Sequence, residues 1–464
     1  MDYNVDLTVV GAGPGGYAAA IRAAQMGAKV VLVEKDQPGG TCLNRGCIPT
    51  KTLVETADLA RKFAKAREYG FTDIEVKIDL QRVMARKNLV VENLRNGLVQ
   101  LFRKNKITLV KAMAEVRQPG KVHLTLDSGE EEVIKTKNIV LATGSRSLVP
   151  PIEGIDIPAV YNSDTILEIT ALPGDLVIIG GGVIGLEFAS IFSALGTKVT
   201  IIEMLPNLLP VVDKDLSRRL LPVLKKSGIK VYTGTTVQRV EEVGSKIQLT
   251  TAAAGENKTL TAGAVLLAAG RTPAVTGINV DALGLELNGK AVKVNERMET
   301  NIPGIYAVGD CTGGIMLAHV ALAEGIVAAE NALGGHAAMD YTVVPNCIFT
   351  YPEIGSVGLM EDEAKEQGMD VSVSRFPFAA LGKAVAAGET FGMVKLVAEE
   401  KTGRLLGGHV LGPHATELIA EIALAVKKGL TAADVAGTIH GHPTLSEATA
   451  EAAHGINGKP LHSV

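Results

Sequence analysis

Short hydrophobic runs alternate with glycine-rich turns along the first part of this chain. Residues 7–10 (LTVV) and 176–179 (LVII) have the continuous apolar character of strands that are covered on both faces. Each run leads directly into a glycine-rich turn, GAGPGG at 11–16 and GGGVIG at 180–185, and then into a segment of helical length. The pattern therefore predicts the same strand–turn–helix unit twice.

Both units continue into a second strand that ends on a carboxylate. These strands, 29–34 and 198–203, finish at Glu34 and Glu203, at identical spacing from the first glycine of their turns. Strand, glycine turn, helix and acidic residue together form the context of a Rossmann fingerprint, in which a pyrophosphate approaches the glycines and the helix N-terminus. The carboxylate accepts hydrogen bonds from a ribose diol and repels a 2′-phosphate, so the second unit, with Gly185 as its third glycine, favours NAD over NADP.

The repeat and a later change of pattern divide the chain into segments. We expect residues 1–149 and 150–274 to form two nucleotide-binding domains, with 275–345 as a central segment that completes the first of them. From 346 to 464 the pattern changes to mixed strand and helix, with helical periodicity over 416–428. The predicted fold class is α/β, with two Rossmann-like domains and a C-terminal α+β domain.

Composition excludes several function classes. The 464 residues carry a formal net charge of −4, which argues against nucleic acid or an anionic membrane as a partner. No apolar run approaches the roughly 18 residues of a membrane span, and the acidic N-terminus does not resemble a secretory signal. Only four cysteines are present, so we expect a reducing compartment, the cytoplasm, in which any disulfide is catalytic.

Two of the four cysteines lie close together. Cys42 and Cys47 occur in GGTCLNRGCIPTK at 39–51, whereas the other two lie far downstream. Two thiols are too few for structural zinc, so no metal is expected. From spacing alone, two buried thiols with no chemical role remain an alternative to a redox pair.

A bridge between these cysteines requires an irregular backbone. Residues five apart on a regular helix have Cα atoms about 8.7 Å apart, whereas a disulfide needs less than about 7 Å. Gly46 supplies the freedom for a distorted turn. Such a small ring is readily reduced, and a helix that begins here stabilises a thiolate.

The segment 39–51 resembles the active-site segment of the pyridine nucleotide–disulfide oxidoreductases, and within them those that oxidise dihydrolipoamide. The resemblance spans nearly the whole chain in the order typical of the family. Its further motifs are ATG at 142–144, Glu187 in the second unit, GRTP at 270–273, Gly309-Asp310, LAH at 317–319 and HPTLSE at 442–447.

The resemblance implies FAD on the first unit and NAD on the second. Glu34 would hold the FAD ribose, Asp310 its ribityl chain, and Lys51 would lie near the flavin, paired with Glu187. The FAD-binding positions implied are Gly11, Gly13, Gly15, Gly16, Glu34, Thr41, Lys51, Thr143, Gly144, Asp310 and Ala318. The NAD-binding positions implied are Gly180, Gly182, Val183, Ile184, Gly185, Glu187, Glu203, Val237 and Gly270.

His442 is the candidate base. Glu447 follows it after a proline, and a carboxylate near a histidine raises its basicity and selects a tautomer. From the residues alone, a loop with an incidental ion pair remains an alternative, whereas the resemblance implies catalysis. His440 lacks the same context and is expected to be structural. Three other side chains are also interpreted as structural, the first two as small buried thiols: Cys311, Cys347 and His319.

The implied reaction is the oxidation of dihydrolipoamide by NAD. The substrate thiolate attacks Cys42, Cys47 becomes the thiolate next to the flavin, and the pair is the redox-active disulfide. The resemblance implies a homodimer in which each subunit contributes its base to the other active site. A lipoyl-bearing carrier protein or domain of a multienzyme complex supplies the substrate. The catalytic positions implied are Cys42, Cys47, Lys51, Glu187, His442 and Glu447.

Two residues depart from the pattern typical of the family. Arg45 replaces a small apolar residue, and we expect its charge to lower a thiolate pKa or to shape the substrate channel. Ala274 replaces an asparagine that many relatives carry after GRTP, which leaves the local contacts open.

Three alternatives remain. Glutathione reductases usually carry basic residues near the second acidic strand end, where this chain has Glu203-Met204-Leu205. Mercuric reductases usually end in an extra cysteine pair, whereas this sequence ends in LHSV at 461–464. A non-catalytic NAD-binding scaffold would need neither the cysteine pair nor the pair of His442 and Glu447.

Overall fold

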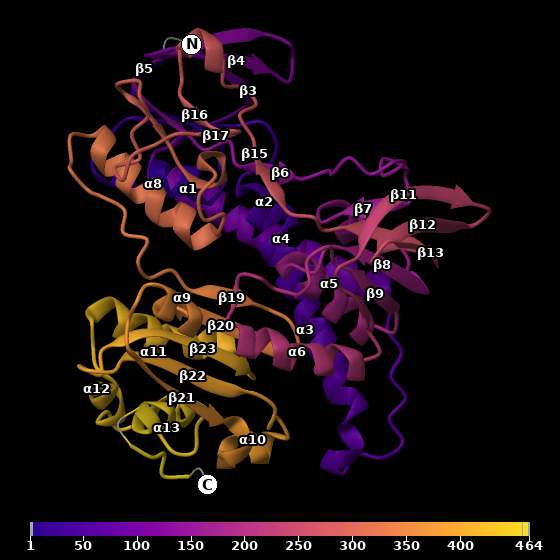
Figure 1. Ribbon diagram of the computed structural model, residues 1–464. Coiled ribbons are helices and arrows are strands. Elements are labelled where there is room, and N and C mark those ends of the chain that lie inside the picture. The colour runs from indigo at the N-terminus through magenta and orange to yellow at the C-terminus, as the bar shows by residue number, and fades with distance from the viewer. Residues whose placement is uncertain (1–2, 457, 463–464) are drawn as a thin grey trace.

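A computed structural model describes residues 3–456 and 458–462 of the chain. Residues 1–2 and 463–464 lie outside this part. They belong to the N-terminus that was compared with a secretory signal and to the C-terminus that was compared with mercuric reductases. Figure 1 shows three sheets with their helices: the first at the top, the second at the right and the C-terminal sheet at the lower left. The predicted α/β class is confirmed.

The first sheet joins both ends of the nucleotide-binding region. Its order is β1-β2-β3-β4-β5-β18, with β1 also paired to β5. β1, β2, β5 and β18 run parallel, so their carboxyl ends meet at one edge. Its strands are β1 (Tyr3–Val10), β2 (Val30–Glu34), β3 (Thr108–Gln118), β4 (Lys121–Leu126), β5 (Glu131–Leu141) and β18 (Ile305–Ala307).

The second sheet is entirely parallel, in the order β10-β9-β8-β14-β7. An antiparallel meander, β11-β12-β13, lies between β10 and β14 in the chain. The strands of the sheet are β7 (Val160–Asn162), β8 (Asp175–Ile179), β9 (Lys198–Ile202), β10 (Lys230–Tyr232) and β14 (Ala264–Leu267). The meander comprises β11 (Thr236–Val243), β12 (Lys246–Ala253) and β13 (Glu256–Ala262).

The C-terminal sheet is antiparallel, in the order β19-β20-β23-β22-β21. The predicted helix over 416–428 is confirmed as part of α11, which buries Ile419, Ile422 and Ala425 against this sheet. The strands are β19 (Asn346–Ile348), β20 (Glu353–Gly358), β21 (Val371–Pro377), β22 (Met393–Glu399) and β23 (Leu405–Gly412). Two small ladders complete the strands: β6 (Ser145–Ser147) with β15 (Arg271–Pro273), and β16 (Leu287–Asn288) with β17 (Ala291–Val292).

Helices cover the sheets and connect them. α3 and α4 form a long pair that descends from the first sheet past the second (Figure 1). In the first nucleotide-binding region the helices are α1 (Pro14–Gln25), α2 (Gly40–Arg45), α3 (Cys47–Ala64), α4 (Leu80–Lys104), α7 (Val280–Leu283) and α8 (Ala318–Ala332). The second sheet has α5 (Val183–Ala194) and α6 (Lys214–Lys226). The C-terminal sheet has α9 (Glu361–Glu366), α10 (Gly382–Ala387), α11 (Ala415–Lys428), α12 (Ala432–Ala436) and α13 (Glu447–Ile456).

No helix in the described part of the chain is both long enough and apolar enough to cross a membrane.

Candidate active site

The two glycine turns share one geometry. A Cβ on Gly16 would lie 1.8 Å from the Gly11 carbonyl oxygen, and one on Gly185 would lie 2.0 Å from that of Gly180. Each helix thus packs so closely on its turn that only glycine fits. The first residues of both turns have positive φ, +101° and +118°, which glycine adopts without strain. Both turns therefore hold free helix N–H groups where a pyrophosphate can approach.

The two acidic residues also lie in matching networks. Glu34 accepts the Ala12 N–H at 2.8 Å and the Asp36 N–H at 2.9 Å. Glu203 accepts the corresponding Gly181 N–H at 2.6 Å and Leu205 N–H at 2.7 Å. Each carboxylate retains lone pairs for a ribose diol, so the residues present fit one dinucleotide on each unit.

Three further positions implied for FAD, Thr143, Gly144 and Asp310, follow the carboxyl ends of β5 and β18, beside those of β1 and β2. Thr41 lies on α2. The Thr143 hydroxyl donates to the Ala274 carbonyl oxygen at 2.6 Å, and Ala274 N–H donates to Gly144 at 2.9 Å. Residue 274 thus acts here through its backbone, which an asparagine would also provide. Asp310 accepts a hydrogen bond from Ser145, whose hydroxyl accepts one from Arg271.

Other predicted positions lie nearby in the fold. Ala318 begins α8. Gly182 precedes α5, and Val183 and Ile184 open it. Val237 lies on β11, two residues after Thr235, whose N–H donates to the Glu203 carbonyl oxygen at 2.9 Å. Gly270 follows β14 with a φ of +109°. In the described residues, no group of three metal-ligating side chains could hold an ion.

Gly46 separates the two cysteines by interrupting a helix. α2 ends at Arg45, α3 begins at Cys47, and Gly46 has φ −143° and ψ −106°, outside helical geometry. A Cβ on Gly46 would lie 3.0 Å from the Thr41 carbonyl oxygen, so a larger residue would strain the break. The distorted turn predicted from the spacing is thus present, and Cys47 is the first residue of an 18-residue helix.

The structure holds the two cysteines as free, half-buried thiols that differ in acidity. A hydrogen bond from Cys42 and the charge of Lys51 lower the pKa of Cys47 to about 7, against the opposing effect of burial. The same hydrogen bond with Cys47, together with burial, raises the pKa of Cys42. In this reduced pair, Cys47 is the thiolate near neutral pH and Cys42 stays protonated.

Lys51 is one helical turn after Cys47 and forms an ion pair with α5. Its ammonium lies 2.9 Å and 3.0 Å from the two Glu187 carboxylate oxygens and 4.5 Å from the centre of the Phe349 ring. Glu187 is buried and also accepts the Phe349 N–H at 2.9 Å. The predicted pair thus connects three parts of the chain: α3, α5 and the segment before β20.

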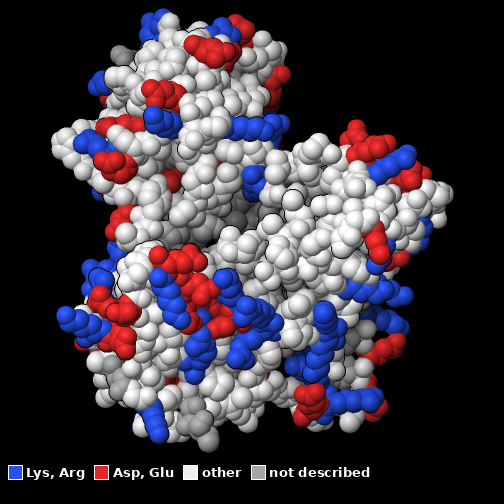
Figure 2. Space-filling view, viewed as in Figure 1, with Lys and Arg blue, Asp and Glu red and all other residues white. Residues whose placement is uncertain are grey.

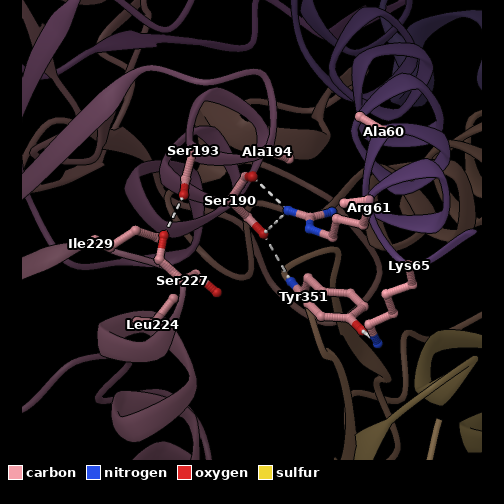
Figure 3. Close-up of a pocket in the computed structure, with 11 residues that line it drawn as sticks. Ala60, Arg61, Lys65, Ser190, Ser193, Ala194, Leu224, Ser227, Ile229 and Tyr351 are labelled. Carbon is pink, nitrogen blue, oxygen red and sulfur yellow. Dashed lines mark hydrogen bonds between the residues drawn. The ribbon is translucent and has the colours of Figure 1, made fainter. Parts of the chain in front are cut away.

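A second set of contacts one turn further along α5 supports this pair. Figure 3 shows Arg61 of α3 donating to Ser190, whose hydroxyl also accepts the Tyr351 N–H at 2.9 Å. These residues line a cavity of about 320 Å³ between α3, α5 and α6. Glu187 and Ser190 each contact both α3 and the segment 349–351. Because α5 is held at both positions, Lys51 has a fixed partner.

His442 and Glu447 lie at the start of α13. The His442 Nδ1 atom lies 2.8 Å from a Glu447 carboxylate oxygen, and the second oxygen accepts the Thr444 N–H at 2.8 Å. Burial opposes ionisation, but these two bonds hold the pKa of Glu447 below its ordinary value. An ionised carboxylate only accepts, so Nδ1 carries the proton and Nε2 is free as a base.

The orientation of His442 matters for its reach. Its side chain is 78% exposed, and Figure 1 shows α13 at the bottom of the molecule, well separated from α2, which carries Cys42. His440, in contrast, is only 8% exposed and is held by Glu421 and the Thr438 carbonyl oxygen, as a structural residue would be. Within one chain, His442 therefore faces solvent and not the cysteine pair.

Two expectations need correction. Cys347 is only half-buried, and it lies close enough for the Lys51 charge to lower its pKa, although burial raises it more. Arg45 forms an ion pair with Asp36 beyond β2 and is not among the main causes of the pKa shift of either thiol, so the expected effect on a thiolate is wrong, whereas its role in the substrate channel stays a prediction. Its charge acts on Glu34 instead, where burial raises the pKa and Arg45 opposes that rise. Cys311 is fully buried, as predicted.

Tyr17 is a neighbour of the thiols that sequence patterns do not reveal. It lies on α1 directly after the glycine turn. Burial raises the pKa of its hydroxyl most, and the two cysteines raise it further. Its only signal in the sequence is that position. His319 is exposed, and its ring lies 2.9 Å from the Pro345 carbonyl oxygen.

Replacing Arg45 with valine tests the corrected assignment. We expect the pH midpoint for alkylation of Cys47 to stay unchanged, because Arg45 is paired with Asp36. FAD affinity should fall by no more than about fivefold, since an exposed ion pair contributes about 1 kcal/mol at most. Iodoacetamide labelling against pH and FAD fluorescence on dilution measure the two effects. A shifted alkylation midpoint would show that the Arg45 charge reaches the thiols.

Comparison with known proteins identifies the family. Residues 5–325 match the family model described as pyridine nucleotide-disulphide oxidoreductase, and residues 344–453 match the dimerisation domain of the same family. The chain is 41% identical to a dihydrolipoyl dehydrogenase of Chlamydia pneumoniae, over 100% of this chain and 99% of that protein. It is 42% identical to one of Halobacterium salinarum, over 99% and 98% of the two chains.

Solved structures give the same result for the fold. The HOCl-induced flavoprotein disulfide reductase RclA of Escherichia coli superposes with a TM-score of 0.89 at 31% identity, covering 98% of this chain and 99% of that one. LpdA of Mycobacterium tuberculosis superposes with a TM-score of 0.91 at 27% identity, covering 97% and 99%. The chain therefore belongs to the pyridine nucleotide-disulphide oxidoreductase family, with the dimerisation domain of that family at its C-terminal end.

Proposed function

We propose that this protein is a dihydrolipoyl dehydrogenase: it oxidises protein-bound dihydrolipoamide to lipoamide, with FAD as resident cofactor and NAD as acceptor. The observation that carries the proposal is the unequal thiol pair next to the Lys51–Glu187 ion pair. Several relatives of similar length bear the name dihydrolipoyl dehydrogenase. The geometry agrees with a reaction that begins at one thiol and leaves charge on the other.

The charge of Lys51 favours Cys47 as the sulfur that leaves. Disulfide exchange is faster when the leaving thiol has the lower pKa. Attack on the Cys42 Sγ atom expels Cys47 as a thiolate, and the Lys51 ammonium, one helical turn away, lowers the pKa of Cys47 and stabilises that thiolate. We therefore assign Cys42 to the substrate and Cys47 to the flavin side.

The steps balance as two sulfur displacements. The Nε2 atom of His442 first takes the proton of one substrate thiol and later releases it to solvent. The resulting thiolate forms a bond to Cys42 Sγ while the Cys42–Cys47 bond breaks and Cys47 leaves as a thiolate. The Nε2 atom of His442 takes the proton of the second substrate thiol, whose sulfur then displaces Cys42 and closes the lipoamide disulfide. Cys42 takes up the proton, and Lys51 stabilises the remaining negative charge on Cys47. FAD bound on the first unit would supply an acceptor for the electron pair of the dithiol, with NAD as the final hydride acceptor.

The active site requires two subunits in this proposal. The dimerisation domain, residues 344–453, contains both His442 and Glu447. His442 points outward from its own chain, so in a two-fold symmetric homodimer it can serve the cysteine pair of the partner. The lipoyl group comes from a carrier protein or domain of a 2-oxoacid dehydrogenase or glycine cleavage complex. The reducing chemistry of the thiol pair favours the cytoplasm as its location.

Other functions of the family explain the residues less well. A glutathione reductase that uses NADP needs a cation near the second ribose, but Glu203 fills that place with two backbone hydrogen bonds. A non-catalytic scaffold gives no reason for a lowered pKa at Cys47.

Absorbance and turnover of the purified protein test the proposal. We expect a yellow protein that reduces NAD with dihydrolipoamide and, on partial reduction, gains the long-wavelength absorbance of a thiolate beside a flavin. A colourless protein that cannot take up FAD, or a yellow one that turns over glutathione or mercuric ion but not dihydrolipoamide, would reject it.

Glu203→Arg tests the cofactor preference. The carboxylate that accepts the Gly181 and Leu205 N–H groups disappears, and a cation takes its place. We expect kcat/KM for NAD to fall by about 10- to 100-fold, the effect of losing hydrogen bonds to a charged group, and NADP to become a usable acceptor. Steady-state kinetics with both nucleotides measure this.

Glu203→Gln is the matched control, because it keeps the shape and removes the charge. It should weaken NAD less than the arginine variant and give no gain with NADP. NAD kinetics that remain unchanged in Glu203→Arg would show that this residue does not reach the ribose.

A further inference from the structure

A group of charged side chains connects the second sheet to the C-terminal sheet. Lys395 of β22 is almost fully buried, and its ammonium lies 2.8 Å from Asp213 and 2.9 Å from both Asp215 and Glu361. Arg375 of β21 reaches Asp215 at 2.7 Å and Glu361 at 2.6 Å. We call these five residues the interdomain ion cluster. Figure 2 shows acidic and basic side chains gathered on this face of the molecule.

Burying these charged groups costs folding free energy that their ion pairs must offset. A buried ammonium loses its hydration, and an apolar residue of similar size is often as stable. Burial opposes ionisation of Asp215, yet hydrogen bonds from Lys395 and Arg375 lower its pKa to about 2. Hydrogen bonds from Lys365 and Lys395 likewise lower the pKa of Glu361 to about 2, so both carboxylates stay ionised at physiological pH. The carboxylates of the cluster come from two different parts of the chain: Asp213 and Asp215 from the start of α6, and Glu361 from α9.

A loop, residues 204–212, connects Glu203, the proposed NAD ribose ligand, to Asp213 at the start of α6. Its Leu209 N–H donates to the Gly181 carbonyl oxygen at 3.2 Å. The Leu208 side chain packs on Gly181 so closely that a Cβ there would lie 2.4 Å from it. The loop thus contacts the glycine turn of the second unit through both backbone and side chain.

Two features show that this loop conformation is imposed from outside. Leu209 is fully buried with a φ of +47°, a left-handed conformation that leucine rarely adopts. Asp213 uses one carboxylate oxygen to accept the Asp215 N–H at 2.9 Å at the start of α6, which leaves the other oxygen for Lys395. Lys395 therefore fixes the far end of a strained loop whose near end bears on the nucleotide turn.

We propose that Lys395 is a positioning residue of the NAD site: through Asp213 it holds the loop 204–212 against Gly181, and so places the Glu203 carboxylate. The inference rests on the proposed function only in that the second unit binds NAD. It makes the C-terminal sheet, which lies within the segment that matches the dimerisation domain, a support for nucleotide binding.

Asp213→Asn is the decisive variant. Asparagine still starts α6, and Lys395 keeps Asp215 and Glu361, so the fold is retained while one ionic contact is weakened. We expect KM for NAD to rise about tenfold with kcat little changed, and direct NADH binding to weaken equally. Reduction of the enzyme by dihydrolipoamide without NAD should keep its wild-type rate.

Glu361→Gln is the matched control, because it removes a carboxylate from Lys395 on the side of the C-terminal sheet. It should lower thermal stability and leave KM for NAD unchanged. Lys395→Met should reproduce the KM effect of Asp213→Asn, and if it does not fold, the two milder variants still decide.

Equal KM values in Asp213→Asn and wild type would overturn the inference. An equal rise in Asp213→Asn and Glu361→Gln would also overturn it, since the cluster would then be a structural support alone. Failure of the proposed function is distinguishable, because wild-type enzyme would then show no dihydrolipoamide-driven reduction at all.

Discussion

The Cys42→Ser protein should bind FAD normally and lose NAD-dependent oxidation of dihydrolipoamide by a factor on the order of 10³ or more. A serine hydroxyl cannot form the mixed disulfide, and removal of a covalent nucleophile removes the whole pathway. The hydroxyl can still donate a hydrogen bond to Cys47, and Lys51 is still present. Cys47 should therefore remain a thiolate, alkylated by iodoacetamide with a pH midpoint of about 7.

The direction of this pH dependence follows from the two opposed shifts. The pKa of Cys47 is lowered and that of Cys42 is raised, so alkylation of the reduced wild-type protein should modify Cys47 first as the pH rises through 7. Peptide mass spectrometry distinguishes the sites. Cys347→Ser is the thiol control, with turnover retained. Turnover retained in Cys42→Ser, or early labelling of Cys42 in the wild type, would contradict the assignment.

The repeated nucleotide unit could be predicted because its determinants are local. Gly11 and Glu34 lie within one strand–turn–helix–strand segment, and Gly180 and Glu203 lie within the other. Spacing alone therefore fixes the relation of each glycine to its carboxylate. The helix break at Gly46 is local as well, because a bridge over five residues cannot form on a regular helix.

Contacts between distant segments could not be predicted in the same way. No periodic sequence pattern marks the hydrogen bond between Ser190 and Tyr351 or the ion cluster around Lys395. The partners are far apart in the sequence and come together only when the sheets pack. The expected effect of Arg45 on the thiol pKa values is wrong for the same reason. Arg45 is close to the cysteines in the sequence, but its side chain forms an ion pair with Asp36.

The catalytic base is the part of the proposed active site that depends most on a second subunit. His442 and Glu447 form the predicted pair, yet they face outward, away from Cys42 in the same chain. A base that must act on a sulfur has to lie within hydrogen-bond reach of the substrate thiol. Only a second subunit can bring it there in the proposed mechanism, so the pair and the dimer are one hypothesis.

Hybrid dimers test that hypothesis directly. His442→Gln and Cys42→Ser should each be nearly inactive as homodimers, since one lacks the base and the other the nucleophile. If each site combines the Cys42 of one subunit with the His442 of the other, a hybrid of the two variants contains one intact site. Random mixing by coexpression makes about half the dimers hybrids, so about one quarter of wild-type activity should return. A site built within one chain would restore none, because both subunits of the hybrid would then carry a defective site. Coexpressing Glu447→Gln with His442→Gln provides the control, because both changes affect the same base and no intact site can form.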